Sequence, residues 1–297
     1  MATTAQTSRL AASDGLFLAV DITGPEVGYP VLLLHGGGQT RHSWHHTAGV
    51  LGERGFHVYN ADLRGHGDSD WSPDGDYVLD AFATDVRAIA NGIAMADPQH
   101  RLPALVGASL GGISSLAAVG ETADAVASAL VLVDVGPQIE REGADRIGAF
   151  MMEHMVEGFA TLEEVAAAIG AYNPHRPRPS NLEGLKKNLR ERDGRWFWHW
   201  DPAFITGRRG SSDETRMLTE PTRLHDATVA FAQRNIPTLL VRGRQSDLLS
   251  EEGAREYLRL VPHAQFIDVV GAGHMVAGDR NDIFNDAVVE FLQSLEG

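Results

Sequence analysis

Short apolar runs that alternate with helix-length amphipathic segments constrain this chain more than any other feature. Residues 31–34 (Val-Leu-Leu-Leu) and 129–133 (Ala-Leu-Val-Leu-Val) are apolar at every position, as in strands buried on both faces of a sheet. Similar runs occur at 16–22, 56–60, 105–106, 237–241 and 265–270. Helical patterns occur at 41–54, 79–94, 110–119 and 284–295. This order predicts an α/β fold with a mostly parallel sheet and helices on both faces.

The alternation stops in the middle of the chain, where no convincing buried strand occurs. The sequence there predicts two amphipathic helices, a proline-rich connector and an aromatic segment, at 147–155, 162–169, 173–179 and 196–200 respectively. We therefore expect residues 1–136 and 223–297 to form the α/β core. Residues 137–222 are expected to form a helical cap, or lid, inserted after the sixth strand.

Charge and cysteine content exclude several classes of function. The 297 residues include 25 Lys and Arg against 40 Asp and Glu, for a net charge of −15. This acidity argues against binding to nucleic acids and to anionic membranes. The absence of cysteine excludes disulfides, cysteine-ligated metals and a thiol nucleophile. We see no secretory signal in residues 1–13 and no apolar run near the roughly 20 residues that span a bilayer, and we expect a cytoplasmic protein.

The most informative motif is Gly107-Ala-Ser-Leu-Gly111, followed by Gly112. It fits G-x-S-x-G, and it lies between a predicted buried strand and a predicted helix. A serine on such a turn projects from the carboxyl edge of the sheet, and small neighbours let strand and helix approach. We therefore predict that Ser109 is a nucleophile. The alternative is a glycine-rich turn whose serine only caps the helix.

A serine nucleophile needs a base and an acid that orients the base. His274 follows the predicted strand 265–270 after a glycine-rich stretch, so we predict it as the base. Two aspartates follow strand ends. Asp247 comes after the strand that precedes the one leading to His274, and we favour it as the acid. Asp134, at the end of the sixth strand, is the alternative.

Acyl transfer also needs backbone N–H donors for the developing oxyanion. Leu110, the residue after the nucleophile, is expected to supply one donor. The loop His35-Gly-Gly-Gly-Gln39 is expected to supply the other, with Gly37 preferred and Gly38 as second choice. A glycine-rich loop without such a role is the alternative.

These motifs together resemble the α/β-hydrolase fold superfamily, in its capped, epoxide-hydrolase-like esterase type. The matching segments, in family order, are 35–38, 62–69 (Asp-Leu-Arg-Gly-His-Gly-Asp-Ser), 107–112, 242–247 and 273–274. The resemblance implies an eight-stranded sheet. Separately, we expect the charged residues of 62–69 to form a hydrogen-bonded turn that supports the sheet edge, and we assign no direct catalytic role to His66.

Departures from neighbouring subfamilies narrow the expected chemistry. Epoxide hydrolases and haloalkane dehalogenases carry Asp where this chain has Ser109. Hormone-sensitive-lipase-like esterases usually carry Asp where this chain has Ala108, and the Ser-Gly-Pro-Gly loop of carbon–carbon bond hydrolases is absent. The expected function is a serine hydrolase that cleaves a small, largely apolar carboxylic ester or lactone through an acyl-enzyme. Perhydrolysis, cofactor-free oxygenation and non-catalytic ligand binding are the alternatives.

We expect Gly38, Met151 and Trp198 to line an apolar substrate pocket. No cofactor and no metal are expected, because His42 and His46 lack an intervening carboxylate and an obvious third ligand. The expected partner is a small-molecule ester, with neither nucleic acid nor membrane, and a homodimer is left open.

Overall fold

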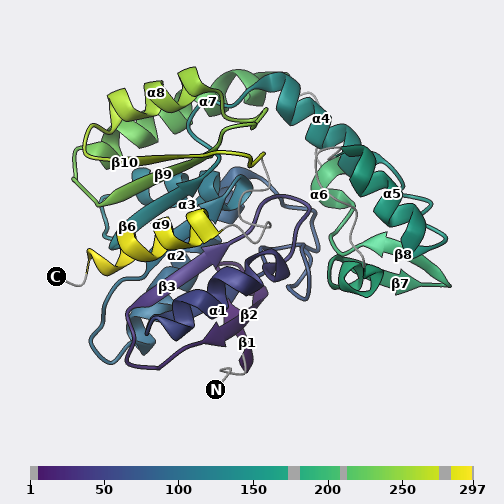
Figure 1. Cartoon of the computed structure of the whole chain (residues 1–297), viewed down its shortest axis with the longest axis horizontal. Coiled ribbons are helices and arrows are strands. Elements are labelled where there is room, and N and C mark those ends of the chain that lie inside the picture. Colours follow the sequence, from purple (N-terminus) through teal and green to yellow (C-terminus); the bar gives the residue numbers. More distant parts are fainter. Residues whose placement is uncertain (1–5, 173–180, 208–212, 274–281, 296–297) are drawn as a thin grey trace.

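The computed structural model describes residues 6–172, 181–207, 213–273 and 282–295. Eight strands form one sheet in the order β1-β2-β4-β3-β5-β6-β9-β10 (Figure 1). Their bounds are β1 Gln6–Ala11, β2 Phe17–Thr23, β3 Pro30–Leu34, β4 His57–Ala61, β5 Ala104–Ala108, β6 Ala129–Val133, β9 Thr238–Gly243 and β10 Gln265–Val269. Strand β2 runs antiparallel to β1 and β4, and the other pairs are parallel. The mostly parallel sheet is therefore as predicted.

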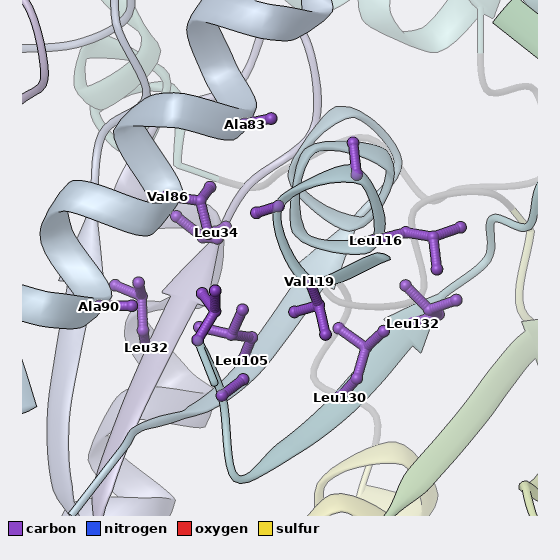
Figure 2. Close-up of a cluster of buried hydrophobic side chains, with 14 of the residues drawn as sticks. Leu32, Leu34, Ala83, Val86, Ala90, Leu105, Leu116, Val119, Leu130 and Leu132 are labelled. Carbon is purple, nitrogen blue, oxygen red and sulfur yellow. The ribbon is translucent and has the colours of Figure 1, made fainter. Parts of the chain in front are cut away.

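Helices cover both faces of the sheet, as the continuous apolar strands require. One face carries α1 (His45–Glu53) and α9 (Asp282–Gln293), which pack with Val31 and Leu33 of β3. The other face packs with Leu32 and Leu34; Figure 2 shows part of this cluster. Its helices are α2 (Leu79–Ala96), α3 (Leu110–Gly120), α7 (Asp213–Ala232) and α8 (Glu251–Leu260). Alternate residues of one strand thus enter two separate cores.

The inserted segment (residues 137–222) stands beside one end of the sheet (Figure 1). Its elements are α4 Arg141–Met152, α5 Leu162–Tyr172, η2 Leu182–Asn188, β7 Leu189–Arg192, β8 Arg195–Trp198, α6 Ala203–Thr206 and the first part of α7. The antiparallel hairpin β7–β8 was not predicted. The predicted boundary at 222/223 falls inside α7, whose Leu224 and Phe231 pack in the main core. The connector 173–179 lies outside the described residues.

The inserted segment is joined to the core by backbone pairing. Gly67 N–H donates to His199 O at 2.7 Å, and Asp201 N–H donates to Gly65 O at 2.7 Å. These bonds place the chain after β8 alongside the turn 62–69.

Within the described residues, no helix is both long and apolar enough to cross a membrane.

Candidate active site

Ser109 occupies the tight turn between β5 and α3 with φ 47° and ψ −115°. Such a conformation costs a non-glycine residue about 1–3 kcal/mol, which the surrounding packing must offset. The turn needs glycine neighbours: a Cβ on Gly107 would lie 2.5 Å from the Gly111 backbone, and one on Gly111 would lie 2.4 Å from Leu34 O. The half-exposed Ser109 is therefore held at the carboxyl edge of the sheet, the position predicted for it.

The loop after β3 leaves one backbone donor available beside this serine. Gly36 N–H donates to Gln39 Oε1 at 3.3 Å, and Gly38 N–H donates to His66 Nε2 at 3.1 Å. Gln39 N–H donates to Gly36 O at 3.2 Å. The N–H of Gly37 has no acceptor among the described residues. These bonds favour Gly37 over Gly38 as an oxyanion donor.

The second expected donor, Leu110, is the first residue of α3, so its N–H lacks an intrahelical partner. The two donors belong to neighbouring segments. A Cβ on Gly37 would lie 3.8 Å from Leu110 Cδ2, and one on Gly36 would lie 3.3 Å from Ser109 Cβ. The loop 35–39 thus packs directly against the serine turn.

Two buried histidines fix this loop. His35 Nδ1–H donates to Gly36 O at 2.8 Å, while its Nε2 accepts from Leu63 N–H at 3.0 Å. His66 Nδ1–H donates to Arg64 O at 2.9 Å, which leaves Nε2 as the acceptor for Gly38. Burial lowers the pKa of His35 to about 4 and that of His66 to about 3. Both rings are therefore neutral at pH 7, as their acceptor roles require.

The unusual pKa values of these histidines predict a loss of stability in mild acid. In the unfolded chain each ring binds a proton near pH 6.5, but in the folded chain only near pH 3–4. The free energy of unfolding should therefore fall as the pH drops from 6.5 to 4.5, by roughly 2 kcal/mol for each ring. Urea unfolding at the two pH values measures this change.

A His66→Gln variant is the control, because glutamine accepts a hydrogen bond but does not titrate. Its stability should depend less steeply on pH. Burial also lowers the pKa values of His42, His57 and His199, and these shifts act in the same direction. Equal wild-type stability at pH 6.5 and 4.5 would contradict this reasoning.

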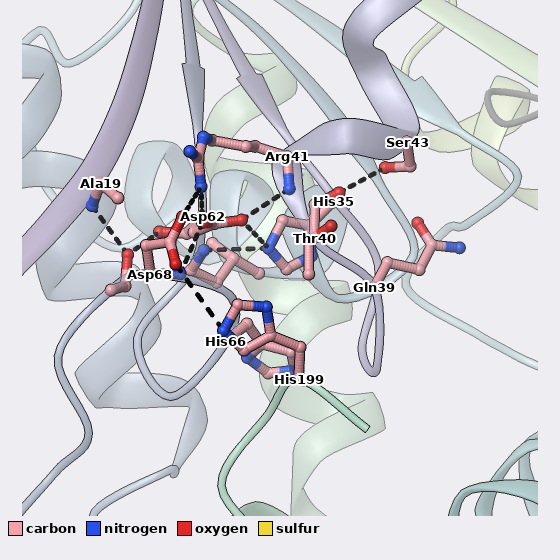
Figure 3. Close-up of polar contacts among 12 residues, drawn as sticks. Ala19, His35, Gln39, Thr40, Arg41, Ser43, Asp62, His66, Asp68 and His199 are labelled. Carbon is pink, nitrogen blue, oxygen red and sulfur yellow. Dashed lines mark hydrogen bonds and ion pairs between the residues drawn. The ribbon is translucent and has the colours of Figure 1, made fainter. Parts of the chain in front are cut away.

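The turn 62–69 is built around a buried carboxylate, Asp62 (Figure 3). Asp62 accepts from Arg41 N–H at 2.6 Å and from Asp68 N–H at 2.9 Å, and it pairs with the Arg41 guanidinium. Arg41 also contacts Asp68 at 2.9 Å and Asp21 at 3.0 Å. Such buried charges are tolerated because each is paired and hydrogen-bonded. The network fixes the end of the loop that starts at His35.

The two candidate acids have different surroundings. Asp134 is fully buried directly after β6; its Oδ1 accepts from Gly243 N–H at 2.9 Å and its Oδ2 from Ser246 Oγ at 2.5 Å. Asp247 is 30% exposed, and its Oδ2 lies 2.6 Å from Arg146 Nη2 on α4. The carboxylate of Asp247 is thus held toward the inserted segment.

The predicted base, His274, lies outside the described residues, so its contacts are not described. The chain that leads to it passes close to both aspartates, because Gln245 N–H donates to Ala272 O at 2.9 Å. Asp134 also lies close to Ser109, because Ser109 N–H donates to Val133 O at 3.2 Å. The sequence alone did not predict these two backbone hydrogen bonds.

A cavity of about 690 Å³ opens between the core and the inserted segment. Its lining includes the serine turn, the loop 35–39 and all three predicted pocket residues: Gly37, Gly38, Ser109, Leu110, Met151 and Trp198. Met151 packs on Gly38, whose φ is +75°. No Lys, Arg, Asp or Glu is among the described lining residues. The cavity is therefore suited to an uncharged ligand.

Metal ligands do not converge in the part of the chain that the structure describes: no three His, Asp or Glu side chains there form a metal-binding group. His42 lies in the short helix η1 (Arg41–Trp44) and His46 in α1. Sequence reasoning named His66 but missed its contact with the loop 35–39. Its position in the turn 62–69 indicated support for the sheet edge, but its bond to Gly38 depends on tertiary contacts.

Comparison with known proteins agrees with this architecture. The chain is 30% identical over 260 residues to the esterase Rv0045c of Mycobacterium tuberculosis, covering 84% of this chain and 78% of that protein. It is 28% identical over 226 residues to the 3-hydroxybutyrate-oligomer hydrolase of Cupriavidus necator, covering 74% and 73%. The crystal structure of E-2-(acetamidomethylene)succinate hydrolase superposes with a TM-score of 0.78 at 23% identity, covering 98% and 100%.

The sequence model of the family described as "Alpha/beta hydrolase family" matches residues 31–287, most of the chain. This match and the esterase relative confirm the family predicted from the motifs. The chain belongs to the alpha/beta hydrolase family.

Proposed function

We propose that this enzyme is a serine hydrolase that cleaves a small, largely apolar carboxylic ester or lactone. The observation that carries the proposal is the position of Ser109, on a strained turn at the lining of a cavity whose described residues carry no charge. The N–H of Gly37, which has no acceptor among the described residues, lies on the adjacent loop. The relatives described as an esterase and as an oligomer hydrolase support ester hydrolysis.

The proposed reaction has two halves. Ser109 Oγ attacks the ester carbonyl while His274 takes its proton, and the N–H groups of Gly37 and Leu110 stabilise the oxyanion. His274 then gives the proton to the leaving alcohol as the carbon–oxygen bond breaks. A water, deprotonated by His274, attacks the acyl-enzyme and releases the acid and the free serine.

The contacts of the acids support Asp134 rather than Asp247, the residue favoured from the sequence, as the group that orients His274. Asp134 is buried beside the nucleophile, and its carboxylate is held by Gly243 and Ser246. Asp247 is paired with Arg146.

We also propose that the inserted segment acts as the lid of the cavity, and that Trp198 sets the substrate range. Trp198 lines the cavity and packs on Phe150, with ring centroids 5.4 Å apart. Trp198→Ala should raise KM for short apolar esters or admit bulkier ones, because a tryptophan supplies about 150–250 Å² of apolar contact but no proton. kcat for a small activated ester should change less than tenfold, as expected for the loss of uniform binding.

Trp196→Ala is the matched control, because Trp196 packs in the inserted segment but is absent from the described cavity lining. Kinetics with 4-nitrophenyl acetate, butyrate and octanoate on variants with wild-type circular dichroism provide the comparison. An unchanged profile in Trp198→Ala would remove the argument for an apolar pocket wall.

The proposed function itself is tested by turnover of 4-nitrophenyl esters and by labelling with a fluorophosphonate. Ester turnover without added peroxide, and under anaerobic conditions, would separate hydrolysis from perhydrolysis and oxygenation. Absence of both turnover and labelling would indicate a non-catalytic ligand-binding protein. The homodimer and the cytoplasmic location stay predictions from the sequence.

A further inference from the structure

Four neutral polar residues, here called the amide strip, run along one wall of the cavity: Gln39, Thr40, Ser43 and Asn188. Gln39, Ser43 and Asn188 line the cavity. Thr40 joins them, since its hydroxyl donates to Asn188 Oδ1 at 2.7 Å and its carbonyl accepts from Ser43 Oγ at 2.9 Å. Figure 3 shows Gln39, Thr40 and Ser43 following one another after the loop that begins at His35. The strip therefore connects the core to η2 of the inserted segment.

The strip begins beside the proposed nucleophile. A Cβ placed on Gly36 would lie 3.3 Å from Ser109 Cβ and 3.5 Å from the carboxamide carbon of Gln39. Gly36 is thus flanked by the serine and by the first residue of the strip. The strip therefore starts within reach of a substrate whose carbonyl is at Ser109.

The existing hydrogen bonds determine which groups the strip presents. Asn188 Oδ1 already accepts from Thr40, and its amide nitrogen has no acceptor among the described residues. Gln39 Oε1 accepts from Gly36 N–H, which fixes the orientation of its carboxamide. Ser43 donates its hydroxyl proton to Thr40 O, so its oxygen remains an acceptor. The amide nitrogen of Asn188 can donate to a hydroxyl or carbonyl oxygen of a ligand, and the oxygen of Ser43 can accept from a ligand hydroxyl.

The remaining lining of the cavity is apolar or uncharged in the described residues. Apolar side chains from the inserted segment include Ile147, Met151, Val165, Ile169 and Trp198. A charged ligand would lack an opposite charge in this lining, and burying an unpaired charge is costly. The cavity therefore combines an apolar wall with a neutral hydrogen-bonding wall.

We propose that the substrate is an uncharged ester with an apolar chain. A second, oxygen-bearing group, in either the alcohol part or the acyl part, is bound by the amide strip. This inference rests on the ester-hydrolase function proposed above and names its substrate class. The ligand chemistry is a hydroxyl or carbonyl oxygen, which either the alcohol or the acyl part can supply.

Two substrate pairs distinguish these sources. Glyceryl and propyl octanoate differ by two hydroxyls on the alcohol, and methyl 3-hydroxyoctanoate and methyl octanoate differ by one on the acyl chain. In at least one pair, kcat/KM should be about tenfold higher for the hydroxylated ester, the size expected for one or two net hydrogen bonds. The pair that shows the preference identifies the side that the strip binds.

Asn188→Leu should bring that ratio close to one. Ser43→Ala, which leaves η2 unaltered, should reduce it about threefold. Leu185→Ala is the matched control on the same short helix: it should lower kcat/KM for both members of a pair and leave their ratio unchanged. Turnover of 4-nitrophenyl butyrate by each variant verifies an intact catalytic centre.

The inference is overturned if the wild type hydrolyses 4-nitrophenyl butyrate but prefers the hydroxylated ester in neither pair. It is also overturned if Asn188→Leu and Ser43→Ala both retain the wild-type ratio. A wild-type protein that hydrolyses none of the esters would instead contradict the proposed function. The two failures are therefore distinguishable.

Discussion

Ser109→Ala is expected to lower kcat for ester hydrolysis by about 10⁴ to 10⁶, because losing the nucleophile of a working triad removes the covalent route. The variant should remain folded. Alanine is smaller than serine, and no hydrogen bond of the Ser109 side chain to a described residue holds the turn. kcat for 4-nitrophenyl butyrate, with circular dichroism and urea unfolding as fold checks, measures the effect.

Ser115→Ala is a matched control within the same helix. Its hydroxyl is buried and donates to Gly111 O at 2.7 Å, so it has no access to substrate. This variant should keep kcat within a few-fold of wild type, and fluorophosphonate should label it but not Ser109→Ala. If Ser109→Ala kept more than a tenth of the wild-type activity, another residue would be the nucleophile.

Asp134→Asn is expected to lower kcat by about 10⁴, whereas Asp247→Asn should lower it less than tenfold. An asparagine in place of the triad acid stabilises the wrong histidine tautomer, which costs about this much in well-studied triads. In Asp247→Asn the main loss is a partly exposed ion pair with Arg146, worth about 0–1 kcal/mol of stability. kcat at saturating 4-nitrophenyl butyrate, on both folded variants, decides between them.

Arg146→Met separates the two roles of Asp247. If that aspartate serves to hold α4, Arg146→Met and Asp247→Asn should have the same small effect on KM and kcat. A strong loss of kcat in Asp247→Asn alone, with an active Asp134→Asn, would restore the assignment favoured from the sequence.

The sequence predicted the central strands and the serine turn because both depend on local patterns. Strand β1 was missed, since only Leu10 and Ala11 of its six residues are apolar and it is the exposed sheet edge. Helix α8 was also missed, although its sequence carries a helical signal: Ser250 caps its N-terminus, and the buried Ala254 and Tyr257 are three residues apart.

The sequence of the hairpin β7–β8 contains a turn motif from which the hairpin could have been predicted. Its turn is Asp193-Gly194, with φ 53° and 73°, and Asp-Gly favours the two-residue turns that join antiparallel strands. The choice between Asp134 and Asp247 carried no such signal. Both follow strand ends, and only the tertiary contacts with Ser246 and Arg146 distinguish them.

The pairing of the chain after β8 with residues 65–67 has a consequence for engineering lids. The backbone of this turn forms hydrogen bonds with the backbone of His199 and Asp201 in the inserted segment. The side chain of His66, in the same turn, accepts a hydrogen bond from the N–H of Gly38 in the core. Backbone bonds place few demands on side chains, so a foreign lid that preserves this three-residue pairing should dock in the same place. Exchange of the whole inserted segment between homologues, with junctions outside 199–201, should then alter substrate range while the loop 35–39 keeps its anchor.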